Sequence, residues 1–288
     1  MNNKDINKSA EFKLKLSRFL VYAILVFLSF LCLFFFYLLI INSTRSDGQL
    51  DSGFTIIPGG HFLENFYNAL HDDDINIPQG MLNSFIIAIS SALLTTYFSA
   101  LTAYGTYAYN FKMKKAVHIF ILAIMMIPSQ VSAVGFIQLA FKYGLTNKLW
   151  VLIIPSIAAP GTYFYMHQYL EATLPLEMVE AARIDGSNEF RIFNEIVLPI
   201  MKPAIAVQMI FAFVASWNNY FMPALLLNKP NTKTVPVLIA QLRSADYTKF
   251  DMGKVYMLML MAILPVMIVY IFLSKAIIKG VTSGSVKG

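Results

Sequence analysis

The chain has 288 residues, of which 57% are hydrophobic and 13% are charged, and its mean hydropathy is +0.61. Soluble domains carry about a quarter charged residues, so a soluble fold would leave too much apolar surface in water, whereas a bilayer accepts such a surface. The formal net charge of +6 includes no basic stripe that could follow phosphates, which excludes a nucleic-acid partner. The single cysteine, Cys32, excludes an internal disulfide and a cysteine-rich metal site. The composition predicts an all-α integral membrane protein.

The first apolar segment follows a basic tail, residues 1–18. It runs from Phe19 to Ile41, about 23 residues, whereas the apolar region of a cleaved signal peptide has roughly 7–15. We therefore predict a permanent transmembrane helix and not a signal peptide.

Six segments have the roughly 20 apolar residues that a spanning helix requires. Together they form one transmembrane domain, 19–278, which a short tail, 279–288, follows. The predicted spans are 19–41, 83–109, 117–141, 149–170, 203–227 and 255–278.

The loops predict the orientation, because cytoplasmic segments are enriched in lysine and arginine. With both termini in the cytoplasm, the inside segments hold 14 of the 22 basic residues. The loop 228–254 departs from this rule, since it lies outside and yet holds Lys229, Lys233, Arg243, Lys249 and Lys254. A partner protein that contacts this loop would explain the excess.

Several kinds of chemistry have no sequence signal. There is no G-x-x-x-x-G-K-[ST] phosphate loop, so the chain is not expected to hydrolyse ATP. No metal site is predicted, because the four histidines are scattered and lack partners at ligand spacing. The spans contain almost no ionisable residues, which argues against an ion-coupled carrier.

The polar loop 171–202 predicts two short helices separated by a break. Glu177 and Glu180 suit the start of the first helix, where the dipole favours negative charge. Gly186 permits the left-handed conformation that ends a helix, and Ser187 is the predicted N-cap of the second. Small residues flanked by charges make a surface that another backbone can approach closely.

This loop carries a motif of fixed spacing. Glu180-Ala181-Ala182, Gly186, Ile196 and Leu198-Pro199 match the pattern E-A-A-x3-G-x9-I-x-L-P at every position. The chain thereby resembles the permease subunits of bacterial ABC importers, with the type I importer permease fold. The resemblance implies that the loop is a coupling helix that docks on an ATP-binding subunit, through Glu180, Ala181, Ala182, Arg183, Asp185 and Gly186.

Further segments resemble the shorter membrane subunit of maltose-type and multiple-sugar importers. These are Asn83-Ser84, Met126-Ile127-Pro128, the stretch 143–147, Ser216–Tyr220 with Pro223, and the tail 279–288. The resemblance implies a multi-pass protein of the bacterial cell membrane. It would pair with a second permease subunit, two ATP-binding subunits and an extracellular solute-binding protein. It would hold no cofactor itself, since ATP and Mg would bind to the partner ATPase subunits.

Two more groups are candidate contacts. Trp217, Asn218, Asn219 and Tyr220 offer the aromatic face and hydrogen-bonding groups that a sugar site needs, although tryptophan and tyrosine also gather at membrane interfaces. In maltose-type systems the loop between the last two spans reaches the binding protein, so Lys233, Arg243 and Lys249 are candidate docking residues.

The sequence thus predicts a non-catalytic permease subunit for a di- or oligosaccharide. Three alternatives stay open. The solute could be a glycerol phosphate, an amino acid or a peptide. The chain could instead be an ion-coupled secondary carrier, or a membrane scaffold or sensor that transports nothing.

Overall fold

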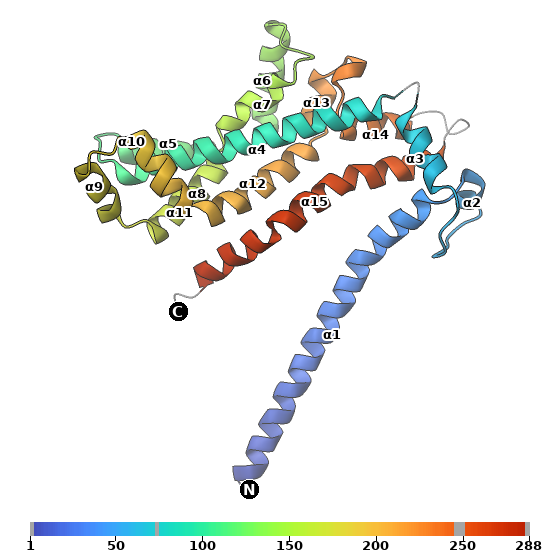
Figure 1. The fold of residues 1–288 in the computed structure, drawn as a ribbon, viewed down its shortest axis with the longest axis horizontal. Coiled ribbons are helices and arrows are strands. Elements are labelled where there is room, and N and C mark those ends of the chain that lie inside the picture. The colour runs from blue at the N-terminus through green and yellow to red at the C-terminus, as the bar shows by residue number, and fades with distance from the viewer. Residues whose placement is uncertain (1–2, 73–74, 245–250, 286–288) are drawn as a thin grey trace. The chain divides into compact units, whose positions relative to one another are not determined.

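A computed structural model describes residues 3–72, 75–244 and 251–285, and every regular element within these ranges is a helix (Figure 1). The chain divides into two compact units: Met1–Ala69 with Thr248–Leu260, and Leu70–Tyr247 with Met261–Gly288.

The first unit contains α1 (Asn3–Ser43), α2 (Asp47–Asp51), α3 (Phe62–Leu70) and the start of α15 (Met252–Ser285). Its centre is polar and closely packed. The Asn65 amide donates to the carbonyl oxygens of Ser43 and Arg45, both at 2.9 Å. A Cβ at Gly253 would lie 2.8 Å from the Arg45 carbonyl oxygen, so only glycine lets α15 approach this close to the α1–α2 connection.

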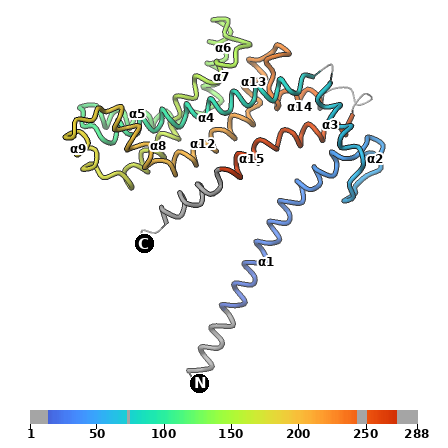
Figure 2. The backbone as a smooth tube through the Cα atoms, in the orientation of Figure 1, coloured from blue at the N-terminus to red at the C-terminus, as the bar shows by residue number. Residues whose placement is uncertain are grey.

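The second unit is built around α4 (Ile77–Ala108). Its N-cap is Asn76, whose side chain accepts from the Gln79 N–H at 3.0 Å. One stripe of α4 is buried at every fourth residue: Ser84, Ala88, Ala92, Thr96, Ala100 and Tyr104. Residues four apart share one face of a helix, and small residues let neighbouring helices pack closely in membranes. The helices α8 (Pro160–Thr173) and α12 (Lys202–Trp217) pack on α4 and run beside it (Figure 2).

Shorter helices complete this unit. They are α5 (Lys114–Ile124), α6 (Ser129–Lys142), α7 (Trp150–Ile153), η1 (Ile154–Ile157), α9 (Leu176–Ile184), α10 (Glu189–Ile192), η2 (Phe193–Val197), α11 (Leu198–Ile200), α13 (Phe221–Leu226), η3 (Pro230–Thr232) and α14 (Val235–Ser244). Of these, η1 and η3 are 3₁₀ helices and η2 is a π-helix.

Within the described ranges, three helices are each long and apolar enough to cross a membrane: Leu14–Ser43, Ile77–Ala108 and Met252–Phe272. Two further pairs meet the same criteria jointly, although each is bent. The bend between α5 and α6 is 91°, and the bend between Glu189–Ile200 and α12 is 82°.

Proline explains where the predicted spans are interrupted. The predicted span 117–141 divides at Pro128, which is the N-cap of α6. The predicted span 149–170 contains Pro155 within η1 and restarts at Pro160, the first residue of α8. Proline has no N–H to donate and clashes with the preceding turn, so each of these predicted spans is interrupted at a proline.

Candidate functional site

The loop between α8 and α12 folds as two helices at nearly the predicted positions. Helix α9 ends at Ile184, and Gly186 follows with φ +79°. The Gly186 N–H donates to the Arg183 carbonyl and the Ser187 N–H donates to the Ala182 carbonyl, both at 3.0 Å. This is the Schellman arrangement, in which a left-handed residue satisfies the last carbonyls of a helix. The prediction that Gly186 ends the first helix in the left-handed conformation is confirmed.

The start of the second helix differs from the prediction by one residue. Asn188 is the N-cap of α10, and its Oδ1 accepts from the Arg191 N–H at 2.8 Å. The predicted N-cap, Ser187, is therefore wrong, because the Schellman turn uses the Ser187 N–H to close α9.

The two faces of α9 have opposite environments. Val179 and Ala182 are buried in the chain's own core, together with Ile192 and Phe193. Glu180, Ala181, Asp185 and Gly186 are exposed, whereas Arg183 is half-buried. Of the two motif alanines, only Ala181 therefore faces outward, and Ala182 fixes α9 on the core.

Two large apolar side chains stand in solvent beside this face. Ile184 is 86% exposed on α9 and Phe190 is 71% exposed on α10. The motif does not include either residue. Because exposed apolar groups rimmed by charges are typical of protein interfaces, we define Glu180, Ala181, Ile184, Asp185 and Phe190 as the α9–α10 surface.

An ion pair joins the two helices. The Arg183 Nε lies 2.6 Å from the Glu189 Oε1, and the Tyr104 hydroxyl donates to Glu189 Oε2 at 3.0 Å. The guanidinium also lies over the Tyr109 ring, 5.1 Å from its centroid. The hydrogen bond from Arg183 holds the pKa of the Glu189 carboxyl below its usual value. These contacts connect α9, α10 and the end of α4.

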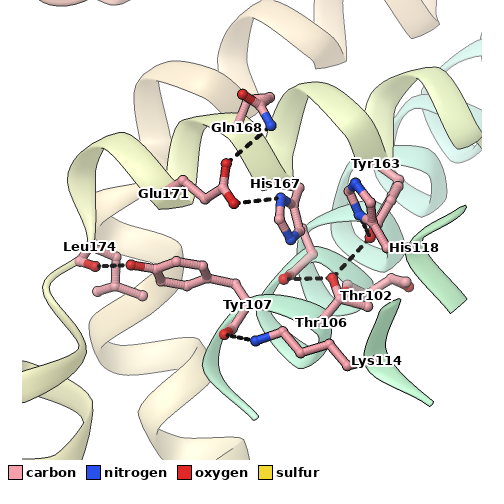
Figure 3. A network of polar contacts seen from close by, with 11 residues as sticks. Thr102, Thr106, Tyr107, Lys114, His118, Tyr163, His167, Gln168, Glu171 and Leu174 are labelled. Carbon is pink, nitrogen blue, oxygen red and sulfur yellow. Dashed lines mark hydrogen bonds and ion pairs between the residues drawn. The ribbon is translucent and has the colours of Figure 1, made fainter. Parts of the chain in front are cut away.

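A polar network reaches Leu174, which lies between α8 and α9 (Figure 3). His118 Nδ1 lies 2.8 Å from the Tyr163 hydroxyl, which donates to Thr106 Oγ1 at 3.0 Å. The rings of His118 and His167 are 4.7 Å apart, and the Tyr107 hydroxyl donates to the Leu174 carbonyl at 2.8 Å.

The network therefore ties α4, α5 and α8 to the segment that leads into α9. This network was not predicted from the sequence, because its members are far apart along the chain.

The side chains of the four predicted contact residues, 217–220, lie in different environments. Trp217 is 3% exposed, stacks on Phe213 and donates from Nε1 to the Ala262 carbonyl at 3.0 Å. Asn218 and Tyr220 are exposed. Asn219 lines two cavities, of about 490 and 450 Å³.

The loop 228–254 is anchored to the start of α4. The Asn83 amide donates to the carbonyls of Asn231 and Lys233 at 3.0 and 2.9 Å, and Ser84 Oγ accepts from the Val235 N–H at 2.9 Å. Of the predicted docking residues, Lys233 is half-buried. Lys249 and the side chain of Arg243 lie outside what the structure describes.

Most of the chain matches a known protein family. Residues 95–282 match the family described as "Binding-protein-dependent transport system inner membrane component". The chain belongs to this family. It is accordingly the permease component of an ABC importer, a non-catalytic, multi-pass subunit of the cell membrane, as the motif predicted.

Individual relatives align with this permease over most of its length. The arabinooligosaccharides transport system permease protein AraQ of Bacillus subtilis is 32% identical over 267 residues, covering 91% of this chain and 92% of the relative. The melibiose/raffinose/stachyose import permease protein MelC of the same organism is 32% identical over 255 residues, covering 88% and 91%.

A solved structure has the same fold as this permease. It is a chain of a bacterial ABC transporter involved in the import of the acidic polysaccharide alginate. The TM-score is 0.79 at 19% identity, over 91% of this chain and 96% of that chain.

Proposed function

We propose that this permease forms half of the translocation pathway for a di- or oligosaccharide that an extracellular binding protein delivers. The observation that carries the proposal is the alignment over about nine-tenths of the chain with permeases named for oligosaccharides. The uncharged polar lining of the cavities at Asn219 is compatible with a neutral, hydroxyl-rich solute.

The proposed assembly contains a second permease subunit and two ATP-binding subunits. In it the α9–α10 surface would sit in a cleft of one ATP-binding subunit. Its support is the exposure of Glu180, Ile184 and Phe190 on helices that are themselves fixed to the core by buried residues. A rigid knob of this kind can transmit a movement, because packed elements shift as bodies and do not deform continuously.

The proposed membrane arrangement has six spans with both termini in the cytoplasm. The three long helices, the bent pair α5–α6 and helix α12 would supply five spans, and the broken segment α7–η1–α8 would supply the sixth. The domain from 19 to 278 would then include the coupling loop 171–202 as a cytoplasmic insertion.

The test is uptake by the reconstituted complex. The permease is co-expressed with its second permease and ATP-binding subunits, placed in proteoliposomes, and supplied with the binding protein and ATP. The panel includes arabinotriose, lactose, raffinose and maltotriose, with glycerol 3-phosphate, an amino acid and a tripeptide as competing solutes. ATP-dependent uptake of at least one of the saccharides is expected. Uptake of only a competing solute would refute the sugar assignment.

We also propose that the loop 228–254 contacts the binding protein. Its five basic residues would complement an acidic surface. Replacing Arg243 and Lys249 together by glutamate is expected to weaken stimulation of the ATPase by the binding protein, and unchanged stimulation would exclude the contact.

A further inference from the structure

Helices α4 and α12 run side by side (Figure 2). Two adjoining cavities lie beside them. The first, of about 490 Å³, is lined by residues of α4, α6, α7, η1, α12 and α13 and by Thr234, which directly precedes α14. The second, of about 450 Å³, is lined by residues of α4, α7, η1, α8 and α12. They share Leu152, Ser216 and Asn219, so together they form one path along the helices. Each volume is within the roughly 300–1,000 Å³ of ordinary ligand sites.

Hydroxyl and amide groups dominate the polar lining of this path. Ser129 and Ser132 contribute to the first cavity, Gln208 contributes to the second, and Asn219 contributes to both. Within the described residues, neither lining includes an aspartate, glutamate, lysine, arginine or histidine. Groups of this kind can exchange hydrogen bonds with a neutral solute, but they cannot neutralise an ionic one.

Two buried hydroxyls of residues that line the path have no hydrogen-bond partner among the residues that the structure describes. Ser91 Oγ in the second cavity and Thr234 Oγ1 in the first make no hydrogen bond within the described part of the chain. Ser91 is 5% exposed and Thr234 is 3% exposed. Buried polar groups are nearly always paired, and an unpaired one is destabilising. Two such groups on one path indicate that a bound molecule completes their hydrogen bonding.

Other buried hydroxyls on α4 do have hydrogen-bond partners within the protein. Thr95 donates to the Ser156 carbonyl at 2.8 Å, and Ser84 accepts from the Val235 N–H at 2.9 Å. On the same helix, Thr96 donates to the Ala92 carbonyl at 2.8 Å and lines neither cavity. Ser91 and Thr234 thus differ from these three hydroxyls, each of which has a protein partner.

We propose that this subunit itself contacts the transported solute through Ser91, Asn219 and Thr234, and that the path selects neutral saccharides over acidic ones. The inference rests on the proposed function. A neutral saccharide supplies hydroxyls that both donate and accept, so it can pair with the two orphaned hydroxyls and with the amide of Asn219. A uronate would bring its carboxylate against a lining that holds no cation to compensate for the hydration that the carboxylate loses there.

The test uses the complete reconstituted complex with saturating binding protein, and a saccharide that the wild-type complex imports. Thr234→Val removes the hydroxyl while keeping the shape, whereas Thr234→Ser keeps the hydroxyl. Ser91→Ala and Asn219→Ala remove the other two groups. Thr96→Val is the matched control, because it removes a buried hydroxyl of α4 that already has a partner. Initial uptake rates are divided by the amount of assembled complex.

Each hydroxyl removal is expected to lower the uptake rate about 5- to 10-fold, the effect of one lost hydrogen bond. Thr234→Ser and Thr96→Val should stay within about twofold of wild type. In a second arm, a digalacturonate should be imported at least about tenfold more slowly than a neutral disaccharide.

The outcomes separate the two proposals. If saccharide is imported but the hydroxyl removals match Thr96→Val, the contact proposed here is wrong and the sugar assignment stands. If digalacturonate is imported as fast as the neutral disaccharide, the selectivity is wrong and the sugar assignment again stands. If the wild-type complex imports no saccharide but does import another solute, both proposals are overturned.

Discussion

The α9–α10 surface and the path along α4 and α12 are assembled in different ways. The surface comes from one continuous segment, 180–190, whose shape depends on local hydrogen bonds such as those around Gly186. The path collects Ser91, Ser132, Asn219 and Thr234 from four separate parts of the chain. Local chemistry can therefore specify the α9–α10 surface. The residues of the path come together only through the packing of helices in the second unit.

The largest effect is expected at Gly186, because the whole surface depends on its conformation. At φ +79° a valine side chain is strained by about 1–2 kcal/mol or more, so Gly186→Val should unwind the turn and reduce uptake to background. Asparagine accepts this conformation more readily, so Gly186→Asn should retain most of the uptake. An equal loss of uptake in Gly186→Val and Gly186→Asn would show that any added side chain is harmful, whatever its preference for the left-handed conformation.

A smaller effect is expected when the apolar contact of the surface is removed. Ile184 is exposed in the isolated subunit, so Ile184→Asp should leave membrane insertion intact while weakening attachment of the ATP-binding subunit by about 2 kcal/mol, as at an interface hot spot. The measurement is the amount of ATP-binding subunit that co-purifies with the permease. Met113→Asp replaces another exposed apolar residue, which lies between α4 and α5 and outside the proposed spans, and it should not release the ATP-binding subunit.

This difference also explains how much could be predicted from the sequence. The break at Gly186 is local, so residue type and spacing were enough to place it. The burial of Ala182 was not predictable, because Ala181 and Ala182 are chemically identical and only the core against α9 distinguishes them. Trp217 was predicted as a candidate sugar contact, and the sequence did not indicate that its indole donates to a carbonyl 45 residues away on α15. Ser91 gave no signal, because a serine looks the same with or without a partner.

The ion pair of Arg183 and Glu189 should have a moderate, pH-dependent effect. The pKa of Glu189 is lowered in the folded protein from an ordinary value of 4.5. The pair therefore stabilises the fold fully above about pH 4.5 and loses this contribution as the pH falls through the lowered pKa. Both side chains are partly exposed, so the contribution is about 1 kcal/mol or less.

Glu189→Gln should lower the melting temperature at pH 7 and reduce its fall below pH 4.5. The measurement is thermal unfolding of the purified complex between pH 3 and 7. The same fall in the variant as in the wild type would assign the acid sensitivity to another group.

The smallest effect is expected at Arg191, which makes a similar contact in a different environment. Arg191 Nε lies 2.7 Å from Glu195 Oε2, nearly as close as the Arg183 pair, but both side chains are mostly exposed. Water and salt screen such pairs, and many contribute nothing measurable. Arg191→Met should therefore leave uptake and the melting temperature unchanged, whereas Arg183→Met should lower both, because only Arg183 also joins α10 to Tyr104 and Tyr109 through Glu189. Measuring the two variants together compares two ion pairs of similar length whose side chains differ in burial. A loss with Arg191→Met as large as with Arg183→Met would mean that charge on the α9–α10 loop matters, and not the connection to α4.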